Sequence, residues 1–347
     1  MENKYEVVII GSGLGGLSTA YILAKHGYKV AVFEKNTQFG GCLQSFVRQG
    51  VKFETGMHYI GSMKEGQILH RYFNYLSLLN DIELSPLDPT GYDIISFRDD
   101  LYHFANGHCN FIDTLSKKFP QNRKDIENYV NTLHKITYNS PYYSFKDFDN
   151  INLIDPEHVK ISVNNYLDGI SNNETLNNIL AGNSPLYAGV KNKTPLYIHA
   201  LISDFYINSA YRIVNSSDTI AKSLIISLKK MGADLYNNAT VNKIICDDEK
   251  AVAIRLNNGE LIDSKYIISD IHPETLLDMI DSHLIRKAYR QRICNMQQTV
   301  STFTVYIKFK DNTVPYLNSN FFKYRSRNVW DCETYSDNIW PKNYLYM

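Results

Sequence analysis

The sequence predicts an α/β fold, in which a three-layer domain built on an N-terminal β-α-β unit is joined to a second, mixed α+β domain. Three observations predict it. An apolar run at residues 5–10 enters a cluster of glycines, a helical pattern follows, and a second apolar run begins at residue 29. Residues 62–200 carry mainly helical patterns of apolar residues. From about residue 218 the alternation of helix and strand returns.

The N-terminal unit begins with YEVVII at residues 5–10, which is typical of a buried parallel strand. Residues 14–26 then predict a helix, which Gly27 ends. The apolar side chains that share one face of this helix are Leu14, Leu17, Ala20, Tyr21 and Ala24. The run KVAVFEK at residues 29–35 completes the unit and places Glu34 at its end, about 20 residues beyond the glycines.

The glycines between the first strand and the helix have the spacing G-x-G-x-x-G, at Gly11, Gly13 and Gly16. Gly11 permits the sharp turn, Gly13 lets the backbone approach a pyrophosphate, and Gly16 lets the helix lie close against the strand. The start of the helix stabilises the anion through its N–H groups and its partial positive charge. The Glu34 carboxylate can accept hydrogen bonds from ribose hydroxyls and would repel a 2′-phosphate.

A Gly-rich turn in an ordinary α/β protein is the alternative to a nucleotide site. Strand, helix and acidic residue all stand in register, which favours a Rossmann-like dinucleotide-binding domain. The candidate binding residues of this segment are Gly11, Ser12, Gly13, Gly15, Gly16 and Glu34.

Composition restricts the other function classes. At 347 residues and 44% hydrophobic, the chain can bury the cores of about two domains. Lys plus Arg equals Asp plus Glu at 36 each, so nucleic acid is not an expected partner. Five cysteines without a C-x-x-C pair predict neither a disulfide framework nor a metal site, and they fit a reducing compartment. A first strand that begins by Tyr5 leaves no room for a signal peptide, and no apolar run is long enough to span a bilayer, so we expect a cytoplasmic protein.

The residues just after Glu34 distinguish a flavin site from a nicotinamide site. Lys35 follows directly, and then come Gly40, Gly41 and Cys42. An acidic residue followed within a few positions by a glycine doublet suits FAD, because the chain passes a second time over the pyrophosphate. The expected cofactor is therefore FAD.

The segment EKNTQFGGCLQSFVRQGVKFETGMHYIG, residues 34–61, resembles the N-terminal signature of the phytoene desaturase, carotenoid isomerase and retinol saturase flavoprotein family. The similarity is greatest to the retinol saturase-like branch. Residues 233–277 are similar to the returning segment of that family, in which the backbone at the position of Val241 contacts the adenine.

The sequence departs from the family pattern at three places. Cys42 stands where the phytoene desaturases tend to carry Arg, and Asn215-Ser216-Ser217 stands where relatives usually have a Gly-Gly-Ser turn. Relatives also continue into a C-terminal strand and a Gly-rich helix start beyond the position of Met347, so we expect the chain to be a fragment or a truncated product.

The returning segment also sets the expected domain boundaries. Its patterns predict a helix at 218–231, strands near 240–246 and 250–256, a hairpin turn at 257–259 and a further strand at 302–309. Residues 1–75 and 215–300 would form a discontinuous FAD-binding domain. Residues 76–214 and 301–347 would form a substrate or cap domain.

The resemblance implies a hydride-type transfer between FAD and a carbon–carbon bond of an apolar polyene, which is saturated, desaturated or isomerised. The substrate would be a carotenoid-like or retinol-like small molecule, and peripheral membrane contact is expected if it is a lipid. The chain has no second G-x-G-x-x-G for a nicotinamide cofactor, so the electron donor or acceptor is not identified. Two alternatives share the scaffold, namely a flavin amine oxidase and a non-enzymatic carrier of lipids or prenylated proteins such as the Rab escort and GDP-dissociation-inhibitor proteins.

His58 and Tyr59 are the polar residues expected nearest the flavin, because TGMHYIG follows the strand that reaches the cofactor. His58 could give or take a proton. In the alternative, His58 bonds a backbone carbonyl and Tyr59 only packs. Cys42 is expected to be a small buried residue rather than a group that approaches the flavin.

Overall fold

The computed structural model describes residues 4–144, 155–299, 301–333 and 344–346, and the chain divides into two compact units. Unit 1 comprises residues 1–58, 72–83 and 213–298, and unit 2 comprises residues 59–71, 84–212 and 299–347. The expected boundaries were at residues 75 and 214. In the structure, residues 59–71 belong to unit 2 instead of unit 1, and residues 76–83 belong to unit 1 instead of unit 2. The roles of the two units as cofactor and substrate domains stay a prediction.

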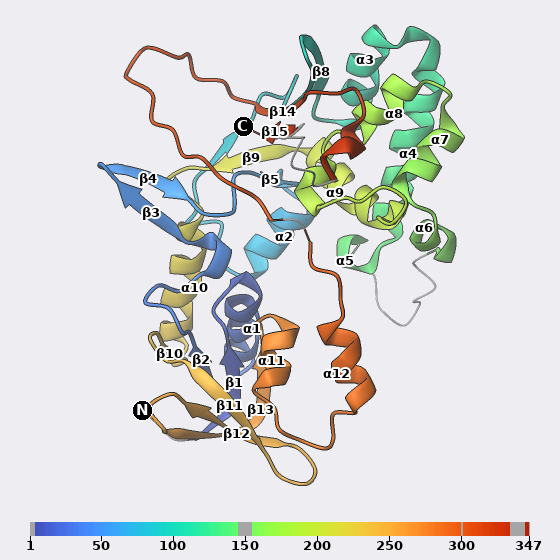
Figure 1. Ribbon diagram of the computed structural model, residues 1–347. Helices are drawn as coiled ribbons and strands as arrows, with labels where there is room; N and C mark the ends of the chain where they lie inside the picture. Colours follow the sequence, from blue (N-terminus) through green and yellow to red (C-terminus); the bar gives the residue numbers. More distant parts are fainter. Residues whose placement is uncertain (1–3, 145–154, 300, 334–343, 347) are drawn as a thin grey trace. The chain divides into compact units, whose positions relative to one another are not determined.

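Unit 1 contains the β-α-β segment and the returning segment (Figure 1). Its helices and strands are β1 (Lys4–Ile10), α1 (Leu14–Lys25), β2 (Val30–Phe33), β3 (Ser45–Arg48), β4 (Val51–Glu54), α10 (Asp218–Lys230), β10 (Asp234–Tyr236), β11 (Val241–Cys246), β12 (Ala251–Leu256), β13 (Leu261–Ser269), α11 (Pro273–Asp278) and α12 (Lys287–Cys294). Helix α2 (Ile68–Tyr75) crosses the boundary between the two units.

A six-stranded sheet in the order β10-β2-β1-β13-β12-β11 forms the centre of unit 1. Strands β10, β2, β1 and β13 are parallel, and β12 and β11 continue the sheet antiparallel. Strand β1 lies between β2 and β13, with both faces covered, and Val8 and Ile9 have no exposed surface. This burial explains why the strand is a continuous apolar run. The sheet and the β1-α1-β2 order confirm the predicted Rossmann-like fold.

Helix α1 packs against this sheet and against α10. Its buried face carries Leu17, Ala20, Tyr21 and Ala24, as the sequence predicted, and Gly27 follows with a φ of +86°. Leu14, which was expected on this face, is 44% exposed because it lies in the first turn, where the helix begins.

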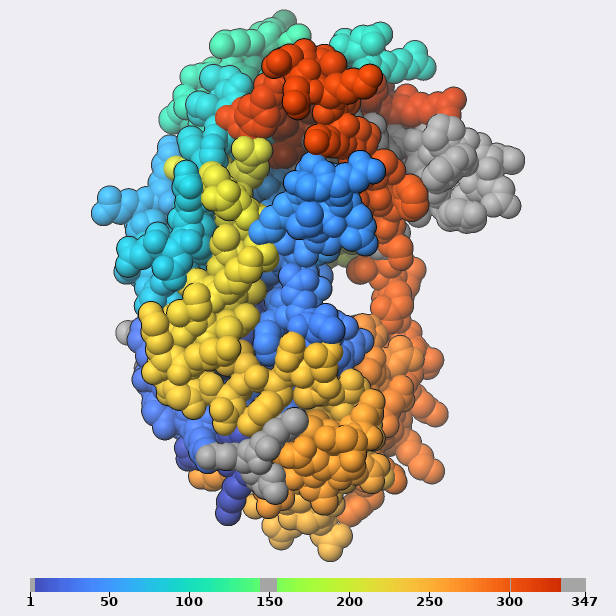
Figure 2. Space-filling model, turned by 90° about the vertical axis from the view of Figure 1, so that its left-hand side faces the viewer, coloured from blue at the N-terminus to red at the C-terminus, as the bar shows by residue number. Residues whose placement is uncertain are grey.

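An apolar cluster joins the N-terminal strands to the returning segment. It contains Val8 of β1, Phe33 of β2 and Ile254 of β12, and Leu276 of α11 packs against it. The two segments also meet at the surface of the unit, where Figure 2 shows blue N-terminal residues beside yellow residues. The yellow part includes α10, which packs on α1, and β10, which pairs with β2. Two segments that are separated by about two hundred residues therefore share one core.

Unit 2 is a mixed α+β unit, as predicted. Its helices and strands are β5 (Ile60–Gly61), β6 (Leu84–Pro86), β7 (Asp93–Phe97), β8 (Asp100–Phe104), α3 (His108–Lys118), α4 (Arg123–Asn139), α5 (Pro141–Ser144), α6 (Pro156–Lys160), α7 (Val163–Ile170), α8 (Glu174–Leu180), α9 (Leu196–Asn208), β9 (Ala210–Ile213), β14 (Asn320–Tyr324) and β15 (Tyr344–Tyr346). One sheet has the order β15-β14-β7-β8 and another the order β5-β9-β6. Among the helices that the structure describes, none has both the length and the apolar character needed to cross a bilayer.

The strand predicted at residues 302–309 does not form, so this prediction was wrong. The apolar side chains alternate as in a strand, but Phe303 is 85% exposed and Val305 is 64% exposed. Of the strands within the described ranges, none pairs with this segment. A strand is held by hydrogen bonds to its neighbour, and an alternating pattern does not supply that neighbour.

Candidate nucleotide-binding site

The Gly-rich turn between β1 and α1 has the geometry of a cradle from which side chains are excluded. Gly11 has a φ of +100°, and a Cβ on Gly16 would overlap the carbonyl oxygen of Gly11. Helix α1 begins after Gly13 without a side-chain cap and without an acidic residue in its first turn. The start of the helix can thus approach a ligand closely with backbone N–H groups.

Glu34 lies at the end of β2 and is 6% exposed. Its carboxylate accepts hydrogen bonds from Ser12 Oγ at 2.5 Å, from Ser12 N at 3.2 Å and from Asn36 N at 2.9 Å. These three donors orient the carboxylate beside the Gly-rich turn. A carboxylate has about four acceptor positions, so a further hydrogen bond from a hydroxyl group can be accommodated.

The glycine doublet brings the chain back over the Gly-rich turn. Gly40 N donates to Ser12 O at 3.0 Å, and a Cβ on Gly41 would lie 3.0 Å from Gly13 Cα. Gly40 and Gly41 both have positive φ, +113° and +55°. The predicted second passage of the chain beside the turn is therefore present.

The two other residues predicted in this segment are on the surface. Lys35 is exposed. Cys42 is also exposed, so the expectation that it is a small buried residue was wrong. It lies in the short 3₁₀ helix Gly41–Leu43, in which only Leu43 is buried. The turn begins at the second of two glycines of positive φ, and it directs Leu43 inward and leaves Cys42 outside.

Val241, the predicted adenine contact, is the first residue of β11 and is 4% exposed. The chain just before it is bound to the end of β2, since Ala239 N donates to Glu34 O at 2.9 Å. Backbone pairing thus holds the returning segment near Glu34.

Sequence reasoning assigned no role to Asp270, but the structure places its carboxylate at the start of α1. Asp270 Oδ2 accepts from Gly16 N at 2.7 Å, and a Cβ on Gly15 would lie 2.6 Å from Oδ1. The position follows from the topology, because Asp270 comes directly after β13, which runs parallel to β1. Carboxyl ends of neighbouring parallel strands meet at one edge of a sheet, and this rule could have found the residue.

A phosphate and the Asp270 carboxylate would use the same N–H groups. Asp270 is exposed, so its side chain can turn away into solvent. The side-chain-free cradle, the glycine doublet and the buried Glu34 fit a dinucleotide with a free 2′-hydroxyl, provided that Asp270 moves aside.

The departure at residues 215–217 is a strained loop. Asn215 has a φ of +67° and Ser216 a φ of +90°, which are conformations that favour glycine. Lys52 Nζ donates to Asn215 O at 3.0 Å, and Glu54 Oε1 accepts from Ser217 N at 2.8 Å. These contacts attach the loop to β4.

His58 and Tyr59 fall in different units. His58 is an exposed residue, and partial desolvation by the surrounding protein lowers the pKa of its imidazole. Tyr59 is 5% exposed in the core of unit 2, where its hydroxyl donates to Asp93 Oδ2 at 3.0 Å and its ring stacks on Tyr206. Tyr59 therefore packs in the core and also holds Asp93 by a hydrogen bond.

A family model described as an NAD(P)-binding Rossmann-like domain matches residues 9–76. This segment includes the Gly-rich turn, Glu34 and the glycine doublet.

Three relatives extend the match beyond this domain. The human all-trans-retinol 13,14-reductase is 28% identical over 278 residues, which are 75% of this chain and 45% of that protein. A 4,4'-diapophytoene desaturase of Methylomonas sp is 22% identical over 360 residues, with 98% of this chain and 68% of that protein covered. The chloroplastic prolycopene isomerase of Daucus carota is 27% identical over 290 residues, 78% of this chain and 46% of that protein. The matched part is thus less than half the length of the reductase and of the isomerase.

Solved structures share the fold at low sequence identity. An oxidoreductase from Methanosarcina mazei superposes with a TM-score of 0.63 at 17% identity, over 84% of this chain and 65% of that chain. A putrescine oxidase variant gives 0.59 at 14% identity, over 84% and 63%. A Rab GDI from Plasmodium falciparum gives 0.52 at 13% identity, over 78% and 66%. The fold is therefore common to the leading function and to both alternatives, and it does not decide among them.

Proposed function

Because the chain is a relative of the retinol reductase, diapophytoene desaturase and prolycopene isomerase proteins, we propose that it is part of an FAD-dependent oxidoreductase that acts on a carbon–carbon bond of an apolar polyene lipid. The names of these relatives describe saturation, desaturation and isomerisation of polyenes. FAD, when bound, supplies hydride-type transfer to or from such a bond. The chain's own residues then have to bind and orient the cofactor and the substrate.

The observation that carries the proposal is the buried Glu34 carboxylate held beside the Gly-rich turn by Ser12 and Asn36. An orientated carboxylate at this place suits the ribose of FAD and repels the 2′-phosphate of NADP. The N–H groups at the start of α1 would hold the pyrophosphate, while Gly41 keeps the returning chain close to it. Val241 would lie on the adenine side.

His58 is our candidate for the group that moves a proton. Desolvation lowers its pKa and so favours the neutral imidazole, which is the form that accepts a proton. Lys35 and Cys42 remain candidates for contacts to the cofactor because both are exposed beside the glycine doublet.

An apolar polyene dissolves in membranes, so an enzyme that uses it has to withdraw it from a bilayer. We therefore propose peripheral contact with a membrane. The cytoplasmic location that we propose rests instead on the cysteines, which fit a reducing compartment.

A substrate screen tests the proposal. The purified protein is incubated with retinoids, with carotenoids and with amines, once with FAD in air, where oxygen accepts the electrons of an oxidation, and once with reduced FAD under nitrogen, which donates the electrons of a saturation. Products are followed by chromatography and mass spectrometry. A polyene product that differs by two hydrogens, or an isomer of the polyene, supports the proposal. Hydrogen peroxide formed from amines would replace it with an amine oxidase. A colourless protein that binds prenylated proteins would replace it with a carrier.

A further inference from the structure

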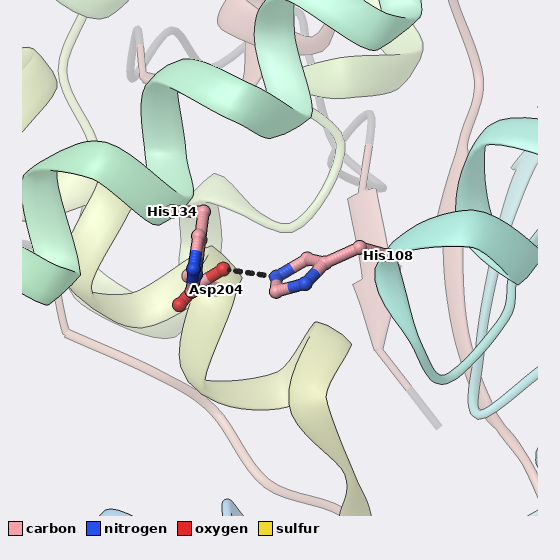
Figure 3. Close-up of side chains that lie close together, drawn as sticks. All are labelled: His108, His134 and Asp204. Carbon is pink, nitrogen blue, oxygen red and sulfur yellow. Dashed lines mark hydrogen bonds and ion pairs between the residues drawn. The ribbon is translucent and has the colours of Figure 1, made fainter.

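Three side chains with metal-binding atoms come together in unit 2, far in sequence from the nucleotide site. His108 is the first residue of α3, His134 lies on α4 and Asp204 lies on α9. Each offers one ligand atom, and these atoms all lie within 4.8 Å of one another. Figure 3 shows the three side chains close together, with a hydrogen bond between His108 and Asp204.

The three residues differ in exposure in a way that suits an ion at the surface. Asp204 is 2% exposed, His108 is half-buried and His134 is exposed. His108 Nε2 lies 2.6 Å from Asp204 Oδ1, and the centroids of the two imidazole rings are 4.8 Å apart. In the described part of the chain, the His134 ring nitrogens have no hydrogen-bond partner. One side of the cluster is therefore open to solvent.

The Asp204 carboxylate is held in place from behind. Its Oδ2 accepts from Thr137 Oγ1 at 2.7 Å and from Asn208 Nδ2 at 3.1 Å, so Oδ1 is left for the histidines. Hydrogen bonds of this kind to the far side of a ligand orient it in metal sites. Within the described ranges, His108 is the one basic residue that pairs with this buried carboxylate.

We propose that His108, His134 and Asp204 bind a divalent transition-metal ion such as Zn²⁺, with water completing the coordination on the His134 side. Two imidazole nitrogens and one carboxylate oxygen favour such an ion over Mg²⁺ or Ca²⁺, which prefer oxygen ligands. Zinc ligands at about 2.0 Å from the ion stand about 3.3 Å apart in a tetrahedral site. His108 Nε2 and Asp204 Oδ1 therefore have to separate by less than about 1 Å when the ion replaces their hydrogen bond.

The ion would join two consecutive helices to a third that is distant in sequence. Residues 108, 134 and 204 belong to α3, α4 and α9, which pack together in the core of unit 2. An ion that binds the folded state alone raises its stability by mass action. This site is independent of the proposed FAD site, and its test does not require flavin.

Binding of Zn²⁺ to the purified full chain by isothermal titration calorimetry tests the proposal, with Co²⁺ absorption as a second readout of coordination. The test variant is His134→Ala, because His134 is exposed and its removal leaves the core intact. The control is His283→Ala, another exposed histidine that lies in unit 1. Adding Zn²⁺ should also raise the melting temperature of the wild type and of the control.

We expect one Zn²⁺ per chain at this site, and at least about 10-fold weaker binding there in His134→Ala than in the control. Free cysteines such as Cys109 and Cys294 are exposed and can bind Zn²⁺ as well, but that binding survives His134→Ala. Equal affinity in the wild type and in His134→Ala would overturn the proposal. An equal loss in the His283→Ala control would also overturn it.

Discussion

At the scale of single residues, Asp270 stands out because it satisfies the start of α1 where a phosphate would bind. Its carboxylate takes the N–H of Gly16 and stabilises the positive end of the helix dipole. One residue would thus contribute to the stability of the free protein and compete with the phosphate of the cofactor that we propose. These two effects have opposite signs and can be separated by mutation.

Asp270→Ala is expected to lower the unfolding free energy by about 0.3–1 kcal/mol, because α1 loses its carboxylate. The same change should strengthen FAD binding by about 5-fold, because the competing charge is gone. Thermal unfolding without ligand and fluorescence titration with FAD measure the two effects. Asp278→Ala, at an exposed residue of α11, is the control and should alter neither. Weaker FAD binding in Asp270→Ala would show that the carboxylate assists the cofactor.

Two buried titratable groups in unit 2 respond to pH in opposite directions. Burial raises the pKa of Asp93 to about 7, although Tyr59 and Asn320 donate to it. Burial lowers the pKa of His199 to about 3, and both ring nitrogens are bonded to Tyr129 and Tyr187. Between about pH 4 and pH 7 the folded state retains a proton on Asp93 that the unfolded state loses, so stability falls as pH rises. For His199 the unfolded state gains the proton below about pH 6.5, so stability falls as pH drops.

Asp93→Asn should therefore flatten one side of the pH profile. At pH 5 wild type and variant both carry a neutral, buried side chain at this position, whereas at pH 8 the wild type alone bears the cost of the charge. Relative to the variant, the wild type should lose on the order of 1–4 kcal/mol of unfolding free energy from pH 5 to pH 8. Urea unfolding at several pH values measures it, with His199→Gln expected to change the profile in the opposite sense. A difference between wild type and Asp93→Asn that is independent of pH would contradict the assignment.

Ser216 has a backbone conformation that favours glycine. Its φ is +90°, and its hydroxyl is buried without a hydrogen-bond partner in the described part of the chain. Ser216→Gly removes the backbone strain and the buried hydroxyl. We expect a gain of about 1 kcal/mol in unfolding free energy, seen as a higher melting temperature. The neighbouring Ser217 has a φ of −62°, so Ser217→Gly should lose stability instead. A loss in Ser216→Gly would mean that the positive φ carries no strain.

At the scale of elements, close packing of α1 on β1 depends on the missing side chain of Gly16. Gly16→Ala places a Cβ against the Gly11 carbonyl, and we expect a loss of about 1–3 kcal/mol together with weaker FAD binding. Gly169 in α7 offers a matched control, because a Cβ there meets no atom within 4 Å. Gly169→Ala should be neutral or gain up to about 1 kcal/mol in differential scanning calorimetry. Equal losses in both variants would show that helix packing is not the reason for Gly16.

Elements with a strong local pattern could be predicted from the sequence, and elements that depend on a distant partner could not. β1, α1 and β2 were predicted within a few residues, because the glycines and the change of period mark their ends. Residues 302–309 carry an equally good strand pattern but lack a pairing strand within the described ranges, so that pattern misled. The same limit applies to the sites. Ser12 and Glu34 lie within one β-α-β unit, whereas Asp270 reaches that site only through the parallel pairing of β13 with β1.

At the scale of the whole molecule, the discontinuous unit 1 is the part to which we assign the nucleotide in our proposal. Its sheet is completed by β10 and β13, which come from beyond residue 230, so the N-terminal segment alone lacks two of its strands. Residues 1–58 and 213–298 must therefore fold together before Glu34 and the Gly-rich turn are in place.

FAD binding by the purified full chain tests the central claim most directly. The absorption spectrum is recorded, the protein is denatured, and the released compound is identified by chromatography, with and without prior addition of FAD. The account predicts released FAD at up to one per chain, and much less in Glu34→Ala than in Glu249→Ala, a control at an exposed glutamate of unit 1. A folded protein that neither carries nor takes up FAD, or one that releases a nicotinamide nucleotide, would contradict it.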